Sequence, residues 1–309
     1  MCSSLWNGMV VAPLGAETAC SLIHPQEVQM QYIETAPPSS TPTVVLVHGS
    51  WHDGSCWSAV QEQLAAVGVR SLAPTLPGHG TGDDRLGVTH DDYVSSVIGM
   101  LDAVHGPTVL VGHSFGGSVI SRAAELRPDS CHGLIYYSAF VPRDAERVAD
   151  SLPSELIEFL EAAAAANSDR SIELPDEVLQ EGFANTADAD TLARIRALLV
   201  PEPYAPIFET LSLPSFPSLP IPTVYIVTRD DRALPPGTFH PGQSSRLDAP
   251  QLIEIDGDHE ILLTAPDRLA DALLEALDAI DAARRERTDE QRISPKLKPS
   301  RHTPLWRSR

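Results

Sequence analysis

A serine, a histidine and two neighbouring aspartates have the types and the chain order that nucleophilic catalysis uses. Ser114 is the middle residue of GHSFG at residues 112–116, which has the form G-x-S-x-G. A serine hydroxyl is a weak nucleophile until a histidine accepts its proton, and a carboxylate must orient that histidine. Downstream lie Asp230, Asp231 and then His259. These residues would support attack of a serine on a carbonyl carbon.

The segment around Ser114 contains the strand and the helix that this motif requires. The apolar run TVLV at residues 108–111 predicts a strand, and the apolar spacing of residues 118–126 predicts a helix. A strand that turns at once into a helix exposes the middle side chain and needs small neighbours. Three glycines within residues 112–117 supply that space. We therefore predict that Ser114 is the nucleophile.

The acid and the base also follow predicted strands. A β-rich run at residues 222–228 ends in RDDRALP at residues 229–235, and a second run at residues 252–255 ends in DGDHE at residues 256–260. Parallel strands bring their carboxyl ends to one edge, where open α/β sheets bind ligands. His259 combines a place after the acid with a place after a strand, so we predict that it is the base.

Two backbone N–H groups are candidates for stabilising a developing oxyanion. One donor in this arrangement comes from the residue after the nucleophile, and the other comes from an early strand-to-helix loop. The run at residues 44–47 leads into HGSW at residues 48–51, which provides that loop. We therefore assign the donors to the N–H groups of Phe115 and Ser50.

Together these segments resemble the α/β-hydrolases, in particular the branch that contains plant methyl esterases and hydroxynitrile lyases, with bacterial esterase relatives. The likeness covers about residues 40–280 and includes PGHG at residues 77–80. In that branch the acid begins a short segment that leads to a proline, so the resemblance implies Asp231, and Asp230 stays open as an alternative. It also implies a serine esterase that needs no cofactor and no metal.

Some enzymes of this fold with other chemistries need residues that this chain lacks at the matching positions. The lyases of this branch carry a lysine after the histidine and a threonine in the early loop, where this chain has Glu260 and Gly49. An acidic residue would repel departing cyanide, so we expect an esterase. Dehalogenases and epoxide hydrolases need an aspartate where this chain has Ser114. A ligand-binding receptor, a lactonase, an amidase, a thioesterase and a carbon–carbon bond hydrolase stay open as alternatives.

The fold class that we predict is α/β, an α/β-hydrolase fold with a mainly parallel central sheet flanked by helices. A small helical lid is expected as an insertion after the sixth strand of that fold. Prolines and short apolar clusters mark the insertion. The predicted divisions are an N-terminal segment at residues 1–26, a first core half at 27–141, the insertion at 142–220, a second core half at 221–283 and a disordered tail at 284–309.

Aromatic residues near these motifs could line an apolar substrate pocket. Trp51 has a motif position beside the predicted site, whereas core packing is an equally good reading of the others. A small or medium hydrophobic substrate would suit such a pocket. The candidates are Trp51, Trp57, Phe140, Tyr204 and Phe208.

Composition limits the partners of the chain. The 42 acidic residues outnumber the 22 basic ones and give a net charge of −20, which disfavours nucleic acid and anionic membranes. The 4 cysteines include no C-x-x-C pair, which fits a reducing compartment, and no basic start precedes an apolar stretch at the N-terminus. We expect a cytoplasmic protein with a small-molecule partner, and homodimerisation stays open.

Overall fold

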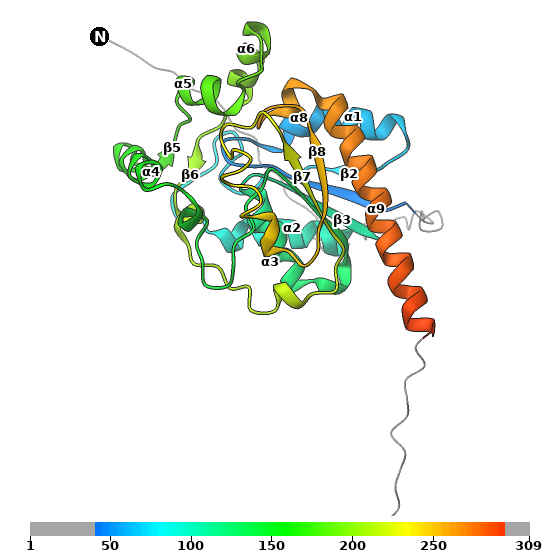
Figure 1. Ribbon diagram of the computed structural model, residues 1–309. Helices are drawn as coiled ribbons and strands as arrows, with labels where there is room; N and C mark the ends of the chain where they lie inside the picture. Colours follow the sequence, from blue (N-terminus) through cyan, green and yellow to red (C-terminus); the bar gives the residue numbers. More distant parts are fainter. Residues whose placement is uncertain (1–40, 294–309) are drawn as a thin grey trace, which may run out of the picture. The chain divides into compact units, whose positions relative to one another are not determined.

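A computed structural model describes residues 41–293 of the chain, whose central feature is a six-stranded parallel sheet (Figure 1). The strands lie in the order β2-β1-β3-β4-β7-β8, and each neighbouring pair is parallel. The predicted α/β-hydrolase architecture is therefore confirmed. The strands are β1 (Thr43–Val47), β2 (Ser71–Leu72), β3 (Thr108–His113), β4 (Cys131–Tyr137), β7 (Thr223–Thr228) and β8 (Gln251–Ile255).

Helices cover both faces of the sheet because its central strands are apolar on both sides. In β1, Val44 and Leu46 face one cluster of buried side chains, and Val45 and Val47 face the other. Helices α2 and α3 belong to the second cluster, and α1, α8 and α9 belong to the first. The helices of the two layers are α1 (Ser58–Ala66), α2 (His90–Ala103), α3 (Gly116–Leu126), α8 (Ile261–Thr264) and α9 (Pro266–Ile293).

The order of the strands creates a switch point between β1 and β3. From β1 the chain first adds β2 on one side and then crosses to add β3 on the other. Val47 at the end of β1 pairs with Gly112 near the end of β3, so the loops after both strands start side by side. Open α/β sheets bind ligands at such a point.

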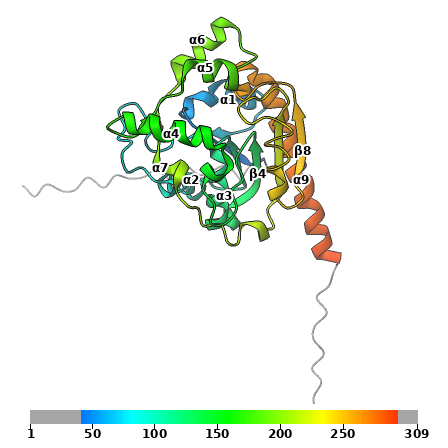
Figure 2. The ribbon, with the colours of Figure 1, turned by 60° about the vertical axis from the view of Figure 1, so that its left-hand side comes forward.

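An insertion separates β4 from β7 and supplies the green helices of Figure 1 and Figure 2. The sequence predicts short helices here, and the structure adds a two-stranded antiparallel pair, β5 with β6. Two-residue strands are too short to produce a periodic pattern, so the pair was not predicted. The elements are α4 (Ser154–Ala166), β5 (Ser171–Ile172), α5 (Asp176–Val178), a π-helical turn (Leu179–Phe183), α6 (Ala189–Leu198), β6 (Glu202–Pro203) and α7 (Ala205–Phe208).

The predicted start of a disordered tail at residue 284 is wrong for residues 284–293, because α9 continues to Ile293. Arg284 donates from Nη1 to the carbonyl oxygen of His132, and Arg287 donates to that of Pro220. These contacts tie the end of the helix to core backbone. The predicted segment at residues 1–26, residues 27–40 of the first core half and residues 294–309 lie outside the described residues.

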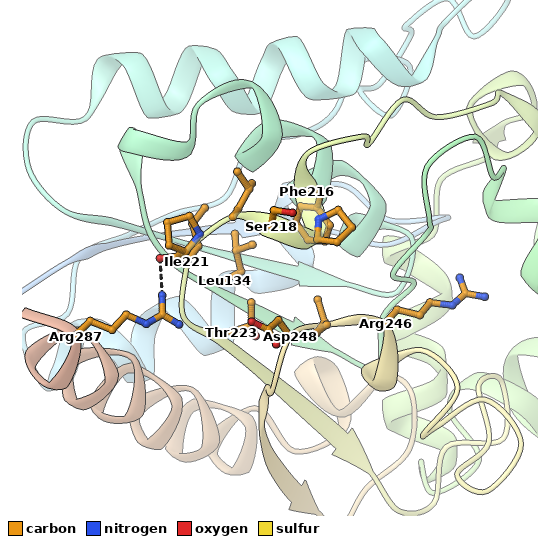
Figure 3. A pocket seen from close by; sticks show the side chains of 12 residues that line it. Leu134, Phe216, Ser218, Ile221, Thr223, Arg246, Asp248 and Arg287 are labelled. Atoms are coloured by element: carbon orange, nitrogen blue, oxygen red, sulfur yellow. Dashed lines mark hydrogen bonds between the residues drawn. The ribbon is translucent and has the colours of Figure 1, made fainter. Parts of the chain in front are cut away.

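A surface groove opens near the amino-terminal ends of β4 and β7, away from the predicted site (Figure 3). It has a volume of about 350 Å³ and is lined by residues such as Leu134, Phe216 and Arg287. None of the predicted site residues lines it. Over residues 41–293, no helix is both long enough and apolar enough to cross a membrane.

Candidate active site

Ser114 stands in a tight turn between β3 and α3. Its φ of 50° lies in the left-handed region, which non-glycine residues enter at a cost. A Cβ on Gly112 would approach the carbonyl carbon of Gly116 to 2.7 Å, and a Cβ on Gly116 would approach the carbonyl oxygen of Val47 to the same distance. The Ser114 N–H donates to the Tyr137 carbonyl at 3.2 Å, which extends the pairing of β3 with β4. The turn is therefore held by its glycines and by the sheet.

Asp231 and His259 meet at the carboxyl ends of β7 and β8. The Nδ1 atom of His259 lies 2.8 Å from Oδ2 of Asp231, and both side chains are buried. The other carboxylate oxygen of Asp231 accepts the N–H of Leu234 at 2.7 Å. Asp230 is exposed instead and accepts the Gly257 N–H at 3.1 Å. Of the two candidate acids, the structure brings Asp231 to the imidazole.

The pKa values of this pair shift in opposite directions. Burial is the largest influence and lowers the pKa of His259, but the surrounding carboxylates, with Asp231 contributing most, together outweigh burial, so the net direction is upward. Burial alone raises the pKa of Asp231, but His259 outweighs it and the net direction is downward. Both shifts favour an imidazolium beside a carboxylate. The pair is therefore arranged to stabilise a proton on the imidazole.

His113 supports His259 from below and does not point into the site. Its Nε2 lies 3.1 Å from the carbonyl oxygen of His259, and its ring stacks on Tyr137 at 4.4 Å between centroids. The Tyr137 hydroxyl donates to the same carbonyl oxygen of His259. Burial holds the pKa of His113 well below its usual value, so this ring is neutral. His113, the neighbour of Ser114, therefore helps to hold the backbone of His259 in place.

The loop after β1 passes directly beside Ser114. A Cβ on Gly49 would lie 2.8 Å from the Cβ of Ser114, so only glycine allows this approach. Ser50 follows in the loop, and Phe115 begins the turn into α3. Neither the Ser50 N–H nor the Phe115 N–H donates a hydrogen bond to another residue in the described part of the chain. Both groups are therefore available to a ligand.

Phe183 of the insertion is a residue of this region that sequence reasoning missed. Its ring stands edge-on to His259 at 5.0 Å and to Trp51 at 5.5 Å, with interplanar angles of 86° and 89°. The Phe183 carbonyl accepts the N–H of Glu260 at 3.2 Å. The signal was weak, because Phe183 is an isolated aromatic residue in a polar stretch at residues 180–190.

The insertion is also tied to the histidine loop by polar contacts. Asp258 accepts from the N–H of Thr186 at 3.0 Å and from its hydroxyl at 2.6 Å. The Asn185 amide donates to the carbonyl of Asp230 at 3.0 Å. The loops that carry Asp231 and His259 are therefore held by the insertion.

Four of the five predicted pocket aromatics lie in one group. Phe140 is buried in the core cluster under α2 and α3, and Trp51, Tyr204 and Phe208 pack against that cluster. Tyr204 and Phe208 stack at 4.3 Å between ring centroids. Trp57 is the exception, because its fully buried ring lies in the opposite cluster beneath the sheet with α1 and α9. Trp57 therefore packs in the core, on the face of the sheet opposite the other four aromatic residues.

Glu260 follows His259 and is fully buried, but its contacts lie with the α1 side of the sheet. Its Oε2 lies 3.4 Å from Nε2 of His52, whose Nδ1 lies 3.0 Å from the carbonyl oxygen of Ser50. Burial raises the pKa of Glu260. The sequence argument placed this carboxylate where it would repel an anionic product; in the structure it faces His52, and neither of its oxygens accepts a hydrogen bond from the described residues. Among residues 41–293, no group of three or more His, Cys, Asp or Glu side chains could hold a metal ion.

The chain is similar to proteins of known family. The model of the Alpha/beta hydrolase family matches residues 44–272. This chain belongs to the α/β-hydrolase family. Its relatives include a pyrethroid hydrolase of Sphingobium wenxiniae, 29% identical over 76% of this chain and 88% of the relative. A carbendazim hydrolyzing esterase of a Nocardioides species is also 29% identical, over 74% of this chain and 97% of the relative.

A solved structure is also similar to this α/β hydrolase. An extracellular α/β-hydrolase from a Paenibacillus species is 35% identical, with a TM-score of 0.73, over 76% of this chain and 98% of that one. It is described as sharing structural and functional homology with tobacco salicylic acid-binding protein 2. Plant methylesterases are among the further relatives. The predicted resemblance is therefore confirmed, and these relatives support a carboxylesterase-like hydrolase.

Proposed function

We propose that this α/β hydrolase cleaves carboxylic esters of a small to medium hydrophobic molecule through an acyl-enzyme on Ser114. The observation that carries the proposal is the 2.8 Å contact between His259 Nδ1 and Asp231 Oδ2. It lies at the sheet edge where Ser114 occupies its left-handed turn. A nucleophile, a base and an orienting acid in this order support acyl transfer.

The first half of the reaction forms the acyl-enzyme. The Ser114 hydroxyl attacks the ester carbonyl carbon, its proton passes to Nε2 of His259, and the carbonyl electron pair moves onto oxygen. The unpaired N–H groups of Ser50 and Phe115 donate to that oxyanion, and each is worth about 3 kcal/mol. The intermediate then expels the alcohol, which takes the proton from His259.

The second half releases the acid. His259 accepts a proton from water, the hydroxide attacks the acyl carbon, and the proton returns to the Ser114 oxygen as the carbon–oxygen bond breaks. Asp231 holds the imidazole in the required tautomer and stabilises its charged form in both halves. The net reaction converts one ester and one water into an acid and an alcohol, so no cofactor enters any step.

The surroundings of the site favour an apolar substrate beneath a lid formed by the insertion. Phe183 and Trp51 present aromatic rings beside His259, and Phe140, Tyr204 and Phe208 extend the apolar group. The names of two relatives, a pyrethroid hydrolase and a carbendazim hydrolyzing esterase, agree with substrates of this kind.

We also propose the setting in which the enzyme acts. Its net charge of −20 disfavours nucleic acid and anionic membranes as partners. The free thiols of Cys56 and Cys131 are buried, which is compatible with a reducing cytoplasm, although one structural relative is described as extracellular. Homodimerisation stays a prediction.

The test compares the wild-type chain with Ser114→Ala on p-nitrophenyl esters of increasing acyl length. We expect the substitution to lower kcat by at least about 1,000-fold, because an alanine offers no nucleophile. Ser58→Ala is the matched control, since Ser58 is exposed on α1 beneath the sheet. Labelling by a fluorophosphonate, located by mass spectrometry, should fall on Ser114.

Retained turnover in Ser114→Ala would remove Ser114 from the mechanism. If the intact protein hydrolyses none of the esters but binds an apolar ligand tightly, the receptor alternative takes the place of the esterase.

A further inference from the structure

A buried carboxylate of the insertion reaches the loop that carries Ser50. Glu202 of β6 is 0% exposed, and its Oε2 accepts the N–H of Trp51 at 3.0 Å. Its other oxygen, Oε1, is buried and accepts no well-formed hydrogen bond among the described residues, while the nearby Ser50 hydroxyl favours the charged carboxylate and acts to lower its pKa. A buried carboxyl group without a full set of hydrogen bonds costs free energy, which raises the question of what Glu202 holds in place. The mechanism above does not use this group.

Glu202 acts with two other groups of the insertion on the same residue. The Val200 N–H donates to the Trp51 carbonyl at 2.9 Å, and the indole N–H of Trp51 donates to the Ile172 carbonyl at 3.0 Å. Trp51 has a φ of 60°, in the left-handed region that a bulky residue enters only when its surroundings hold it there. The Trp51 clamp, formed by Ile172, Val200 and Glu202, provides this hold.

The peptide unit between Ser50 and Trp51 is fixed at both of its polar ends. Glu202 holds the N–H of this unit, and Nδ1 of His52 lies 3.0 Å from its carbonyl oxygen. Fixing this plane limits the rotation of Ser50, whose own N–H is free to bind a ligand. Preorganised donors stabilise an oxyanion more than mobile ones because they need no reorganisation during the reaction.

Glu202 has a pKa of about 8, whereas the titratable side chains of His79 and Tyr93 that face it do not change charge near that pH. Nε2 of His79 lies 3.6 Å from Oε2 of Glu202 and 2.9 Å from the Tyr93 hydroxyl, and Nε of Arg85 donates to the neighbouring Pro201 carbonyl at 3.1 Å. Burial lowers the pKa of His79 and raises that of Tyr93, so both are neutral at pH 8. Burial raises the pKa of Glu202 to about 8.

We propose that Glu202 is a positioning residue of the esterase, which holds the Ser50–Trp51 peptide so that the Ser50 N–H meets the oxyanion. When the Glu202 carboxyl group is neutral, it holds the peptide without placing a negative charge beside the oxyanion that forms during the reaction. The proposal rests on the function proposed above and adds to it a group of the insertion that acts through the backbone of the β1 loop.

The kinetic test uses Glu202→Ala, Glu202→Gln and the matched control Glu173→Gln. Glu173 is exposed and follows β5, so its variant removes one carboxylate from the same part of the insertion. We expect Glu202→Ala to lower kcat about 10- to 100-fold, with KM changed less than about threefold. The affinity for a trifluoromethyl ketone, which forms an oxyanion on the serine, should fall by the same factor. Glu202→Gln should stay within about threefold, because its amide oxygen can still accept from Trp51.

The pH profile gives a second readout that does not depend on the alanine variant folding. Wild-type kcat should decline above about pH 8, as Glu202 ionises beside the oxyanion. Glu202→Gln should lose this decline and the control should keep it. Equal kcat and inhibitor affinity in folded Glu202→Ala would overturn the proposal, and so would an alkaline decline that persists in Glu202→Gln. If Ser114→Ala abolishes turnover in the same assays, either result rejects the role of Glu202 and leaves the serine mechanism standing.

Discussion

Asp231 and His259 stand 28 residues apart in the chain, yet their Oδ2 and Nδ1 atoms lie 2.8 Å apart, and each side chain is 1% exposed. The two residues follow β7 and β8, which are neighbours in the sheet. In a pair this close and this buried, each partner controls the pKa of the other.

Asp231→Asn should change both the rate and its pH dependence. The carboxylate raises the pKa of His259 above its ordinary 6.5, and the base must be neutral to act, so wild-type kcat/KM should rise with pH through a midpoint above 6.5. The variant should move that midpoint downward and lower kcat by about 10,000-fold. The measurement is kcat/KM from pH 5 to 9. Asp230→Asn is the control, and an equal effect there would reverse the choice between the two acids.

The Asp231–His259 pair should make the free energy of unfolding depend on pH. The raised pKa of His259 contributes stability below about pH 6.5 that is lost as pH rises through the folded value. The lowered pKa of Asp231 contributes stability above about pH 3.8 that is lost as pH falls through the folded value. The Tm difference between wild type and Asp231→Asn should therefore be largest near pH 5. A difference that grows steadily toward pH 9 would contradict the pairing.

Phe183→Ala should weaken the binding of apolar substrates. The ring lies beside His259 and Trp51, where the acyl group of a bound ester would pack on it, and one aromatic contact with the substrate would contribute about 0.5–1.5 kcal/mol, so we expect KM for apolar esters to rise up to roughly tenfold. Phe159→Ala serves as the control, because Phe159 is 39% exposed on α4 of the same insertion. Steady-state kinetics on short and long acyl esters measure the effect, and equal KM values in the two variants would remove Phe183 from the pocket.

Two glycines should respond to alanine in opposite ways. A Cβ on Gly112 would approach backbone atoms of Gly116 and Gly117 to within 2.8 Å, so Gly112→Ala should destabilise the protein by about 1–3 kcal/mol or more and abolish esterase activity. Gly99 lies within α2 with nothing within 4 Å of its Cβ position, so Gly99→Ala should stabilise by about 0.5–1 kcal/mol. Urea unfolding compares the two, and a tolerated Gly112→Ala would show that the turn can relax.

The motifs predicted from the sequence are those whose geometry is set locally. Ser114, Asp231 and His259 each follow a strand that its own apolar run identifies, and a parallel sheet brings such strand ends to one edge. The α/β fold was predicted from the same apolar runs. What these three residues do remains a prediction.

The residues that were missed depend on how the insertion and the loops fold back. Glu202 and Phe183 lie in the insertion, and their partners come from distant loops, so no periodic pattern marks them. Trp57 was a pocket candidate with core packing as an equally good reading, and the structure supports core packing, because the 3₁₀ turn at residues 54–57 places its ring in the buried cluster with α1 and α9. The end of α9 was misjudged because its charged residues 284–293 carry little apolar signal.

The insertion between β4 and β7 also has a consequence for how the protein acquires activity during synthesis. Leu134 of β4 pairs with Thr223 of β7 only after the whole insertion has been made and its loop closed. Ser114 and the β1 loop belong to strands that can pair first, while Asp231 and His259 follow β7 and β8. A nascent chain therefore holds Ser114 before Asp231 and His259 can join it, and the ribosome must release the chain beyond residue 259 before the proposed site can assemble.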